Sequence, residues 1–270
     1  MNKRWLVASI AILIVITLLV FIGLNKKRGS LLLLSNIKPV SSLLTQAKEL
    51  EAKGNILEAK DVYQRLINEF PNSNEVMNWQ KKNEELNIKL LFSSTITPKS
   101  ILYQIKPGDT LTKIAKEFNT TPELIMKSNH LSDDKILPDR KIKVWTQAFS
   151  IVVDKSQNTL ILKTDEEIIK TYIVSTGMNN STPTGNFKII NKLQNPPWFK
   201  PGAVVPPGSP ENILGSRWLG FNLPGYGIHG TTDPQSLGKQ VTQGCIRMSN
   251  SDIEELYNIV GVDTGVTIVD

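Results

Sequence analysis

The chain has 270 residues, of which 40% are hydrophobic and 21% charged, and it contains one cysteine and two histidines. Its length allows about two domains, and its composition is that of a globular protein rather than a disordered one. One cysteine cannot form an intramolecular disulfide, and one cysteine with two histidines cannot complete a His/Cys zinc site. We therefore expect neither a disulfide scaffold nor a zinc enzyme, and no metal or organic cofactor.

The net charge of +6 is unevenly distributed along the chain. Residues 1–146 contain 22 basic and 14 acidic side chains, whereas residues 147–270 contain 9 and 11. A basic N-terminal half suits a membrane surface or the anionic polymers of a cell wall. No basic cluster with interleaved aromatic residues is present in the sequence, so we do not expect nucleic acid as a partner.

The N-terminus carries a candidate membrane anchor, residues 1–30. Residues 5–24 form a run of twenty uncharged residues with basic residues on both sides, a length that fits one membrane-spanning helix. The alternative is a cleaved signal peptide, but such a peptide ends in a small-x-small site, which residues 21–25 lack. The sequence favours an uncleaved, single-pass anchor. Because both flanks are basic, charge alone leaves its orientation open.

Residues 41–92 are predicted to be helical. Apolar and small residues recur at helical spacing, Gly54 marks a break between two helices, and Pro71 ends the second; residues 74–92 can form a third. The pattern resembles one tetratricopeptide repeat at these positions: Ala47, Gly54, Ala59, Tyr63 and Pro71. A stable array of such repeats needs about three copies. We therefore favour a helical hairpin that acts as a spacer, and a groove for a protein partner stays the alternative.

A compact segment follows at residues 102–146. Its motifs are Gly108-Asp109-Thr110-Leu111, then Ile114-Ala115, then Asn129-His130-Leu131. Asp109 or Thr110 can cap a first helix, Thr121 precedes a second, and short alternating strands bracket both. This β-α-α-β outline resembles the LysM domain.

The LysM resemblance implies that this segment binds glycans containing N-acetylglucosamine, which in a bacterial wall means peptidoglycan strands. It implies a sugar groove on the loops that follow residues 108–110 and around Asn129 and His130. For His130 itself we expect a loop position without a chemical task. A domain that keeps the fold but binds glycan weakly is the alternative.

Residues 147–270 differ in character, because short β-rich runs alternate with polar turns. The predicted strands cover residues 149–154, 159–162, 171–175 and 187–190, followed by a helix near 251–260 and a last strand at 265–269. Residues 191–210 contain six prolines. We therefore expect a long loop beside the sheet there, of the kind that covers active sites, and no central strand.

Cys245 is the only cysteine, and His229 lies upstream of it in glycine-rich surroundings. A thiol is a strong nucleophile only as the thiolate, and a neighbouring imidazole can accept its proton. The pair therefore suits nucleophilic catalysis. A cysteine taken alone is more typical of a buried structural thiol than of a nucleophile, and the motifs around Cys245 reverse that preference.

Five blocks in residues 147–270 together resemble the YkuD-type L,D-transpeptidase catalytic domain. They are Ser175-Thr176-Gly177, Thr182-Pro183-Thr184-Gly185, Asn195-Pro196-Pro197-Trp198, Gly227-Ile228-His229-Gly230 and Thr242-Gln243-Gly244-Cys245-Ile246-Arg247. The resemblance implies an enzyme that replaces the fourth peptide bond of a peptidoglycan stem. By this resemblance, Cys245 attacks the carbonyl of the third stem residue and holds the stem as a thioester. An amine of a second stem then takes over the stem, which forms a 3→3 cross-link.

The same resemblance implies roles for the neighbouring residues. His229 acts as the general acid and base, and the backbone carbonyl of Gly230 orients its ring. The backbone N–H groups of Gly244 and Cys245 are expected to bind the oxyanion. Substrate contacts are expected from these residues: Thr242, Gln243 and Arg247.

Two of these positions carry qualifications. Many family members have a second histidine where this chain has Gln243, a departure that concerns only a side-chain contribution to the oxyanion site. Arg247 can bind a stem carboxylate bidentately or form a structural ion pair. Trp198 and Trp218 are expected to serve packing rather than substrate binding.

The sequence thus predicts a multidomain protein: a mainly-β L,D-transpeptidase domain preceded by a βααβ LysM domain, an α-helical hairpin and one transmembrane helix. An anchor before wall-directed domains places the bulk of the chain outside the cytoplasm, in the periplasm or cell wall. Two alternatives are an L,D-carboxypeptidase, in which water resolves the same thioester, and a non-catalytic tether that only binds peptidoglycan.

Overall fold

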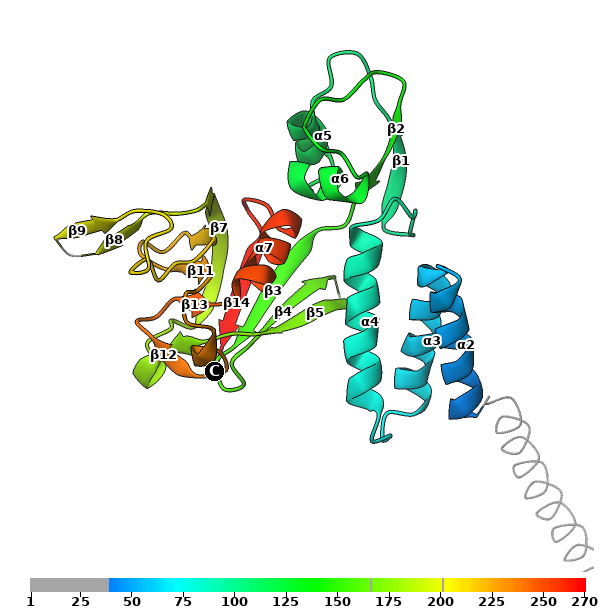
Figure 1. Ribbon diagram of the computed structural model, residues 1–270, viewed down its shortest axis with the longest axis horizontal. Coiled ribbons are helices and arrows are strands. Elements are labelled where there is room, and N and C mark those ends of the chain that lie inside the picture. Colours follow the sequence, from blue (N-terminus) through cyan, green and yellow to red (C-terminus); the bar gives the residue numbers. More distant parts are fainter. Residues whose placement is uncertain (1–38, 166, 201) are drawn as a thin grey trace, which may run out of the picture.

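The computed structural model describes residues 39–165, 167–200 and 202–270 (Figure 1). The predicted anchor at residues 5–24 lies outside these ranges. Within them, no helix has both the length and the apolar character needed to cross a membrane.

Three helices form the N-terminal unit: α2 (Val40–Ala52), α3 (Ile56–Glu69) and α4 (Val76–Leu91). Ala47 and Ala59 are completely buried, so small side chains let α2 and α3 approach closely, as the sequence pattern predicted. Gly54 forms the turn between these helices with a φ of 77°, a conformation that favours glycine. The helices are confirmed, while the tetratricopeptide likeness stays a prediction.

The next unit has the predicted β-α-α-β order. Strands β1 (Ser100–Gln104) and β2 (Lys141–Trp145) pair antiparallel and enclose α5 (Leu111–Glu117) and α6 (Pro122–Ser128). Thr110 caps α5 and Thr121 caps α6, since each hydroxyl accepts a backbone N–H of the first turn. Local capping chemistry thus sets where both helices begin.

Asn129 was expected beside the sugar groove, but its side chain is used inside the fold. Its Oδ1 accepts the Lys143 backbone N–H at 2.7 Å, and its Nδ2 donates to the Lys143 carbonyl at 2.8 Å. The amide therefore joins the end of α6 to β2 and leaves little for a ligand. His130, with a φ of 54°, ends the same turn.

The C-terminal unit, which we call the catalytic unit after the resemblance of its sequence motifs, is built on an eight-stranded sheet with the order β13-β11-β10-β7-β14-β3-β4-β5. Only the pairs β14–β3 and β11–β13 are parallel among the pairs of this sheet. The helix α7 (Asn250–Ile259) packs against β10 and β11, and Ser249 caps it. The strands are β3 (Phe149–Asp154), β4 (Thr159–Thr164), β5 (Glu167–Ile173), β7 (Gly185–Gln194), β10 (Arg217–Phe221), β11 (Gly227–His229), β13 (Ile246–Arg247) and β14 (Gly265–Val269).

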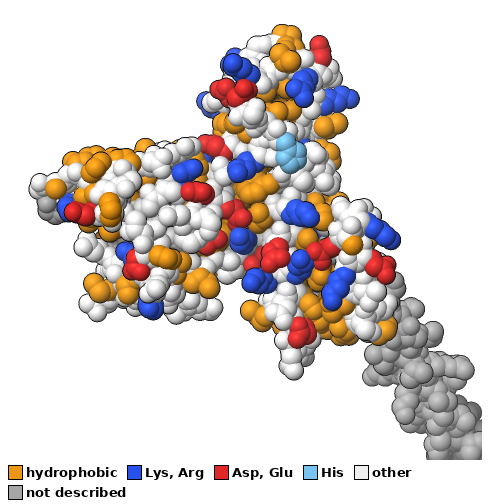
Figure 2. Space-filling view, viewed as in Figure 1, with side chains coloured by type: hydrophobic (Ala, Val, Ile, Leu, Met, Phe, Trp, Pro, Cys, Tyr) orange, Lys and Arg blue, Asp and Glu red, His pale blue; other side chains and the backbone are white. Residues whose placement is uncertain are grey.

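Smaller elements flank this sheet. Two short strands, β6 (Thr176–Gly177) and β12 (Gln240–Thr242), pair in parallel, and β8 (Trp198–Lys200) pairs with β9 (Ala203–Val205) in a hairpin. The 3-10 segments are η1 (Met178–Asn180) and η2 (Pro234–Ser236). The β8–β9 hairpin projects from the end of β7 (Figure 1), and hydrophobic side chains gather on it (Figure 2).

The prediction for residues 191–210 was wrong at its start. β7 continues through Gln194, and residues 191–194 pair with β10 in the middle of the sheet. The reason is that the prolines begin only at Pro196, so the preceding residues keep the backbone N–H groups that a central strand needs.

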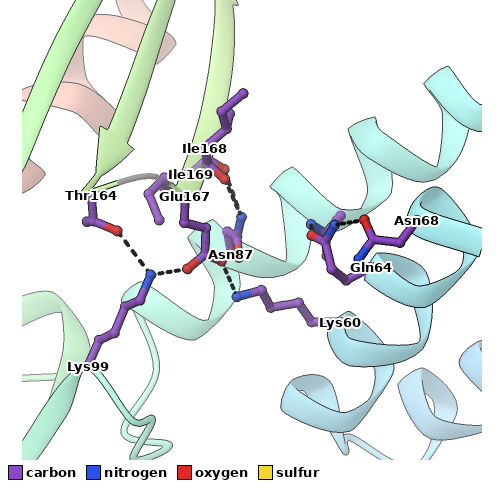
Figure 3. Close-up of polar contacts among 10 residues, drawn as sticks. Lys60, Gln64, Asn68, Asn87, Lys99, Thr164, Glu167, Ile168 and Ile169 are labelled. Carbon is purple, nitrogen blue, oxygen red and sulfur yellow. Dashed lines mark hydrogen bonds and ion pairs between the residues drawn. The ribbon is translucent and has the colours of Figure 1, made fainter. Parts of the chain in front are cut away.

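The helical unit covers an edge of the catalytic sheet and is more than a spacer. Strand β5 is the last strand of the sheet, and α4 lies against it (Figure 3). Asn87 donates to the carbonyls of Ile168 at 3.2 Å and Ile169 at 3.1 Å, and Glu84 accepts the Thr171 hydroxyl at 2.9 Å. Side chains of α4 thus satisfy backbone groups that an exposed edge strand would offer to another chain.

Ion pairs reinforce this junction. Glu167 at the start of β5 binds Lys60 of α3 and Lys99, which precedes β1 (Figure 3). Charged side chains of both signs gather where the helical unit meets the catalytic sheet (Figure 2). One carboxylate therefore contacts the helical unit and the segment that leads into the LysM-like unit.

The LysM-like unit is also fixed to its neighbours. The Lys143 ammonium donates to the carbonyls of Leu90 at 2.6 Å and Ser93 at 2.9 Å, at the C-terminal end of α4, where a cation is favourable. Burial lowers the pKa of Lys143 to about 8. On the other side, the Thr121 hydroxyl donates to the Asn258 carbonyl of α7. The three described units therefore pack as one body.

We predict that Asn87→Leu will lower the free energy of unfolding by about 1–3 kcal/mol, because it removes a donor to two edge carbonyls at a buried position. The measurement is urea unfolding. Asn78→Leu is the matched control, because Asn78 lies on the same helix but is exposed. Equal effects of the two substitutions would contradict the role given to Asn87.

Candidate active site

The pairing of β11 with β13 brings the thiol and the imidazole into one cleft. These strands run parallel, with Ile228 opposite Ile246 and His229 opposite Arg247, so Cys245 lies at the entry to β13 beside the start of β11. Both Cys245 and His229 line a cleft of about 770 Å³ that opens to solvent. The two residues that the sequence singled out therefore line the same cleft.

The walls of the cleft include residues that sequence reasoning assigned to packing. Trp198, on the β8–β9 hairpin, and Trp218, on β10, both line it. Trp198 follows two prolines in the segment expected to lie over an active site, and that position was the available signal. Trp218 carried no such signal, because its place beside His229 depends on strand pairing.

His229 is held in one orientation and kept from water. Its side chain is 2% exposed, and its Nδ1 donates to the Gly230 carbonyl at 2.6 Å, which leaves Nε2 with the lone pair. Burial lowers the pKa of His229 to about 4; the nearby Arg247 guanidinium acts in the same direction and the Gly230 carbonyl in the opposite one. The resting imidazole is neutral and can accept a proton at Nε2.

Asn250 positions the loop that carries the Gly230 carbonyl. Its Oδ1 accepts the backbone N–H groups of Ser216 at 3.1 Å and Thr231 at 3.0 Å, and its Nδ2 donates to the Thr231 carbonyl at 2.9 Å. A Cβ atom on Gly230 would lie 2.2 Å from Asn250 Oδ1, so only glycine fits there. Sequence reasoning missed Asn250, because nothing local connects it with His229.

Cys245 is a protonated thiol at rest. Burial raises the pKa of the Cys245 thiol, while the Gly227 backbone N–H and the Arg247 guanidinium act in the opposite direction. The thiol donates to the Gly225 carbonyl at 3.4 Å. With a raised pKa on the thiol and a lowered pKa on the imidazole, the pair is neutral until a substrate arrives.

Glycine is required at position 244 of the cysteine turn. Gly244 has a φ of 133°, and a Cβ atom there would lie 2.7 Å from the Tyr226 ring. Thr182 donates to the Gly244 carbonyl at 2.9 Å and accepts the Gly177 N–H at 2.7 Å. The turn before the nucleophile is therefore held by two other segments of the fold.

Two residues with predicted roles at the oxyanion and substrate sites, Gly244 and Thr242, also form hydrogen bonds within this turn. The Gly244 N–H, expected in the oxyanion site, donates to the Thr242 hydroxyl at 3.2 Å. That hydroxyl in turn donates to the Cys245 carbonyl at 2.7 Å, so Thr242 shapes the turn. Thr242 also lines the cleft, and its predicted contact with a substrate stays a prediction. In the described part of the chain, the Cys245 N–H has no partner and stays available as a donor.

Arg247 and Gln243 lie on the cleft wall. Arg247 donates from Nη1 to the Ser236 hydroxyl at 2.9 Å and lies 3.9 Å from Asp233, while its buried Nε has no partner among the described residues. Its guanidinium thus has a structural partner and an unused donor. Gln243 is exposed. No three His, Cys, Asp or Glu side chains of residues 39–165, 167–200 and 202–270 come together as a metal site.

Comparisons with known proteins agree with this geometry. The L,D-transpeptidase catalytic domain family matches residues 148–268, and the LysM domain family matches residues 103–145. The putative L,D-transpeptidase YkuD of Bacillus subtilis is 36% identical over 175 residues, which cover 62% of this chain and 98% of that protein. The putative L,D-transpeptidase YqjB of the same organism is 40% identical over 126 residues, which cover 44% and 70%.

Among solved structures, an L,D-transpeptidase from Mycobacterium smegmatis matches at 20% identity with a TM-score of 0.41, over 50% of this chain and 65% of that chain. This likeness is too low to add to the sequence matches. Those matches cover nearly the whole length of a curated relative, and they place Cys245 and His229 inside the matched domain. The chain therefore belongs to the cysteine-dependent L,D-transpeptidase family and carries a LysM domain before its catalytic domain.

Proposed function

We propose that the protein forms 3→3 cross-links in peptidoglycan through a thioester on Cys245. The observation that carries the proposal is the shared cleft, in which a protonated thiol and a neutral imidazole face the same open space. A neutral pair can bind a charged stem peptide first and transfer the proton only when the thiol attacks.

The proposed reaction has two halves. His229 Nε2 takes the thiol proton while Cys245 Sγ attacks the carbonyl carbon of the third stem residue, and the imidazolium then protonates the departing amine of the terminal D-residue. The C–N bond breaks and a thioester remains. An amine of a second stem attacks the thioester, His229 accepts its proton, and Cys245 is released as a thiol. An amine held in position outcompetes water, because proximity favours the aminolysis of the thioester.

Three groups near Cys245 can donate hydrogen bonds to the intermediate or to the bound stem. The tetrahedral intermediate carries a negative oxygen, and the Cys245 N–H is a donor that the fold leaves unpaired. The guanidinium of Arg247, which lines the cleft, suits a carboxylate of a stem peptide. Gln243, exposed on the rim, can add a further donor to the bound stem.

The domain organisation supports action at the wall. We propose a catalytic domain at residues 147–270, a glycan-binding LysM domain at 102–146, a helical unit at 41–92 and an N-terminal anchor at 1–30, with the bulk of the chain outside the cytoplasm. Because α6 packs against α7 and Lys143 binds the end of α4, a glycan strand on the LysM domain would be held at a constant distance from Cys245. Such an arrangement suits repeated reaction along one strand.

The central test incubates the purified protein with tetrapeptide stems and analyses the products by mass spectrometry. We expect cross-linked dimers from the unchanged protein and none from Cys245→Ala. Tripeptides in place of dimers would mean hydrolysis and make the protein an L,D-carboxypeptidase. If the unchanged protein gives neither product and is not acylated by a carbapenem, it is a tether that only binds the wall.

A second prediction concerns the two histidines. His229→Ala should slow acylation of Cys245 by a carbapenem by about 10²–10⁴-fold, because the thiol loses its base. His130→Ala is the matched control, since His130 lies on a LysM loop away from the cleft. The rate is measured by intact-protein mass spectrometry. Equal rates for the two variants would exclude His229 as the base.

The pH dependence of acylation should reflect the buried imidazole. A base works only when unprotonated, and the pKa of His229 is lowered to about 4 from its usual 6.5. The acylation rate should therefore hold its plateau at about pH 5.5 and fall only as the pH approaches 4. Arg247 stays charged throughout this range. A midpoint near 6.5 would show that the imidazole is solvated in the working enzyme.

A further inference from the structure

The indole of Trp218 stacks on the ring of His229. The two residues lie opposite each other on β10 and β11, their ring centroids are 6.1 Å apart, and their planes differ by 18°. This is the offset-parallel geometry of an attractive aromatic pair. Trp218 and His229 both line the cleft, so the stacked pair forms part of its wall.

The surrounding strands are shaped to receive this indole. Its Nε1 donates to Asn191 Oδ1 at 3.1 Å. A Cβ atom on Gly220 would lie 2.6 Å from that nitrogen, and a Cβ atom on Gly227 would lie 2.8 Å from Cζ2 of the indole. The hydrogen bond therefore fixes the indole ring, and any residue larger than glycine at position 220 or 227 would collide with it.

We propose that Trp218 is a positioning residue for the transpeptidase reaction, which fixes the plane of the His229 ring and shields its face from water. The proposal rests on the assignment of Cys245 and His229 as nucleophile and base. The Gly230 carbonyl holds the ring at one nitrogen only, and a single hydrogen bond does not prevent the ring from tilting about it. The stacked indole supplies the missing constraint, so that Nε2 keeps its direction toward the cleft.

The charges around His229 show why shielding matters. Arg247 from β13 is the charged group of the described residues that acts on the pKa of the imidazole, Cys245 lines the same cleft, and β10 contributes the uncharged Trp218. The helix α7 also packs against β11, and no carboxylate of the described residues acts on the pKa of His229. Loss of water is thus the main cause of the lowered pKa, and the indole is part of what excludes that water.

The test compares Trp218→Leu, Trp218→Phe and the unchanged full-length protein in detergent. The acylation rate with a carbapenem is measured by mass spectrometry between about pH 4 and 8. We expect Trp218→Leu to slow acylation on the order of tenfold at pH 7, because a tilted base is out of line with the thiol. We also expect the midpoint of the acid limb, which is the pH at which the acylation rate falls to half of its plateau, to move up toward the ordinary histidine pKa of 6.5. Trp218→Phe, which keeps an aromatic face, should restore both.

Asn191→Leu keeps the indole but removes its hydrogen-bond acceptor. It should lower the acylation rate and raise the midpoint of the acid limb, both by less than Trp218→Leu does. This variant carries the test if Trp218→Leu does not fold. If Trp218→Leu slows acylation but leaves the midpoint of the acid limb unchanged, Trp218 has only a structural role. If the acylation rate is unchanged, Trp218 has no role in the reaction. Absence of acylation in the unchanged protein would instead overturn the function proposed for Cys245, so the two failures are distinguishable.

Discussion

The chemistry of this protein depends on the parallel pairing of two very short strands, β11 and β13. Their register sets His229 opposite Arg247 and leaves Cys245 at the strand entry, facing the same cleft. Neither strand would be stable alone, and both are held by the larger sheet and by α7 behind it. The register of these strands thus sets the positions of both residues, which suits a reaction that needs an aligned nucleophile and base.

Burial gives the site its electrostatic character. Removal of water lowers the pKa of His229 and raises that of Cys245, so the resting pair carries no charge. The Gly230 carbonyl then compensates for part of the cost when the imidazole becomes protonated. Asn250, Thr182 and Thr242 hold the loops on which this arrangement depends.

The N-terminal units are structural parts of the enzyme. Helix α4 covers the free edge of β5 through Asn87 and Glu84, and the LysM-like unit is fixed to α4 and α7 through Lys143 and Thr121. A helix packed along an edge strand makes that edge less available to another chain. The same contacts give the glycan-binding unit a constant position relative to the catalytic cleft.

The sequence by itself determined the β-α-α-β unit, the three N-terminal helices and the cysteine and histidine of the catalytic domain. These features are local, because caps, hydrophobic spacing and motifs act between residues close together in the chain. Tertiary structure decided that β7 extends through Gln194, that Trp218 lies on His229, that Asn250 holds the Gly230 loop, and that the Gly244 N–H is already bonded. Each of these depends on strand register or on contacts between distant segments. The physical reason is that a side chain's partners are chosen by the packing of the whole fold, which no single stretch of sequence specifies.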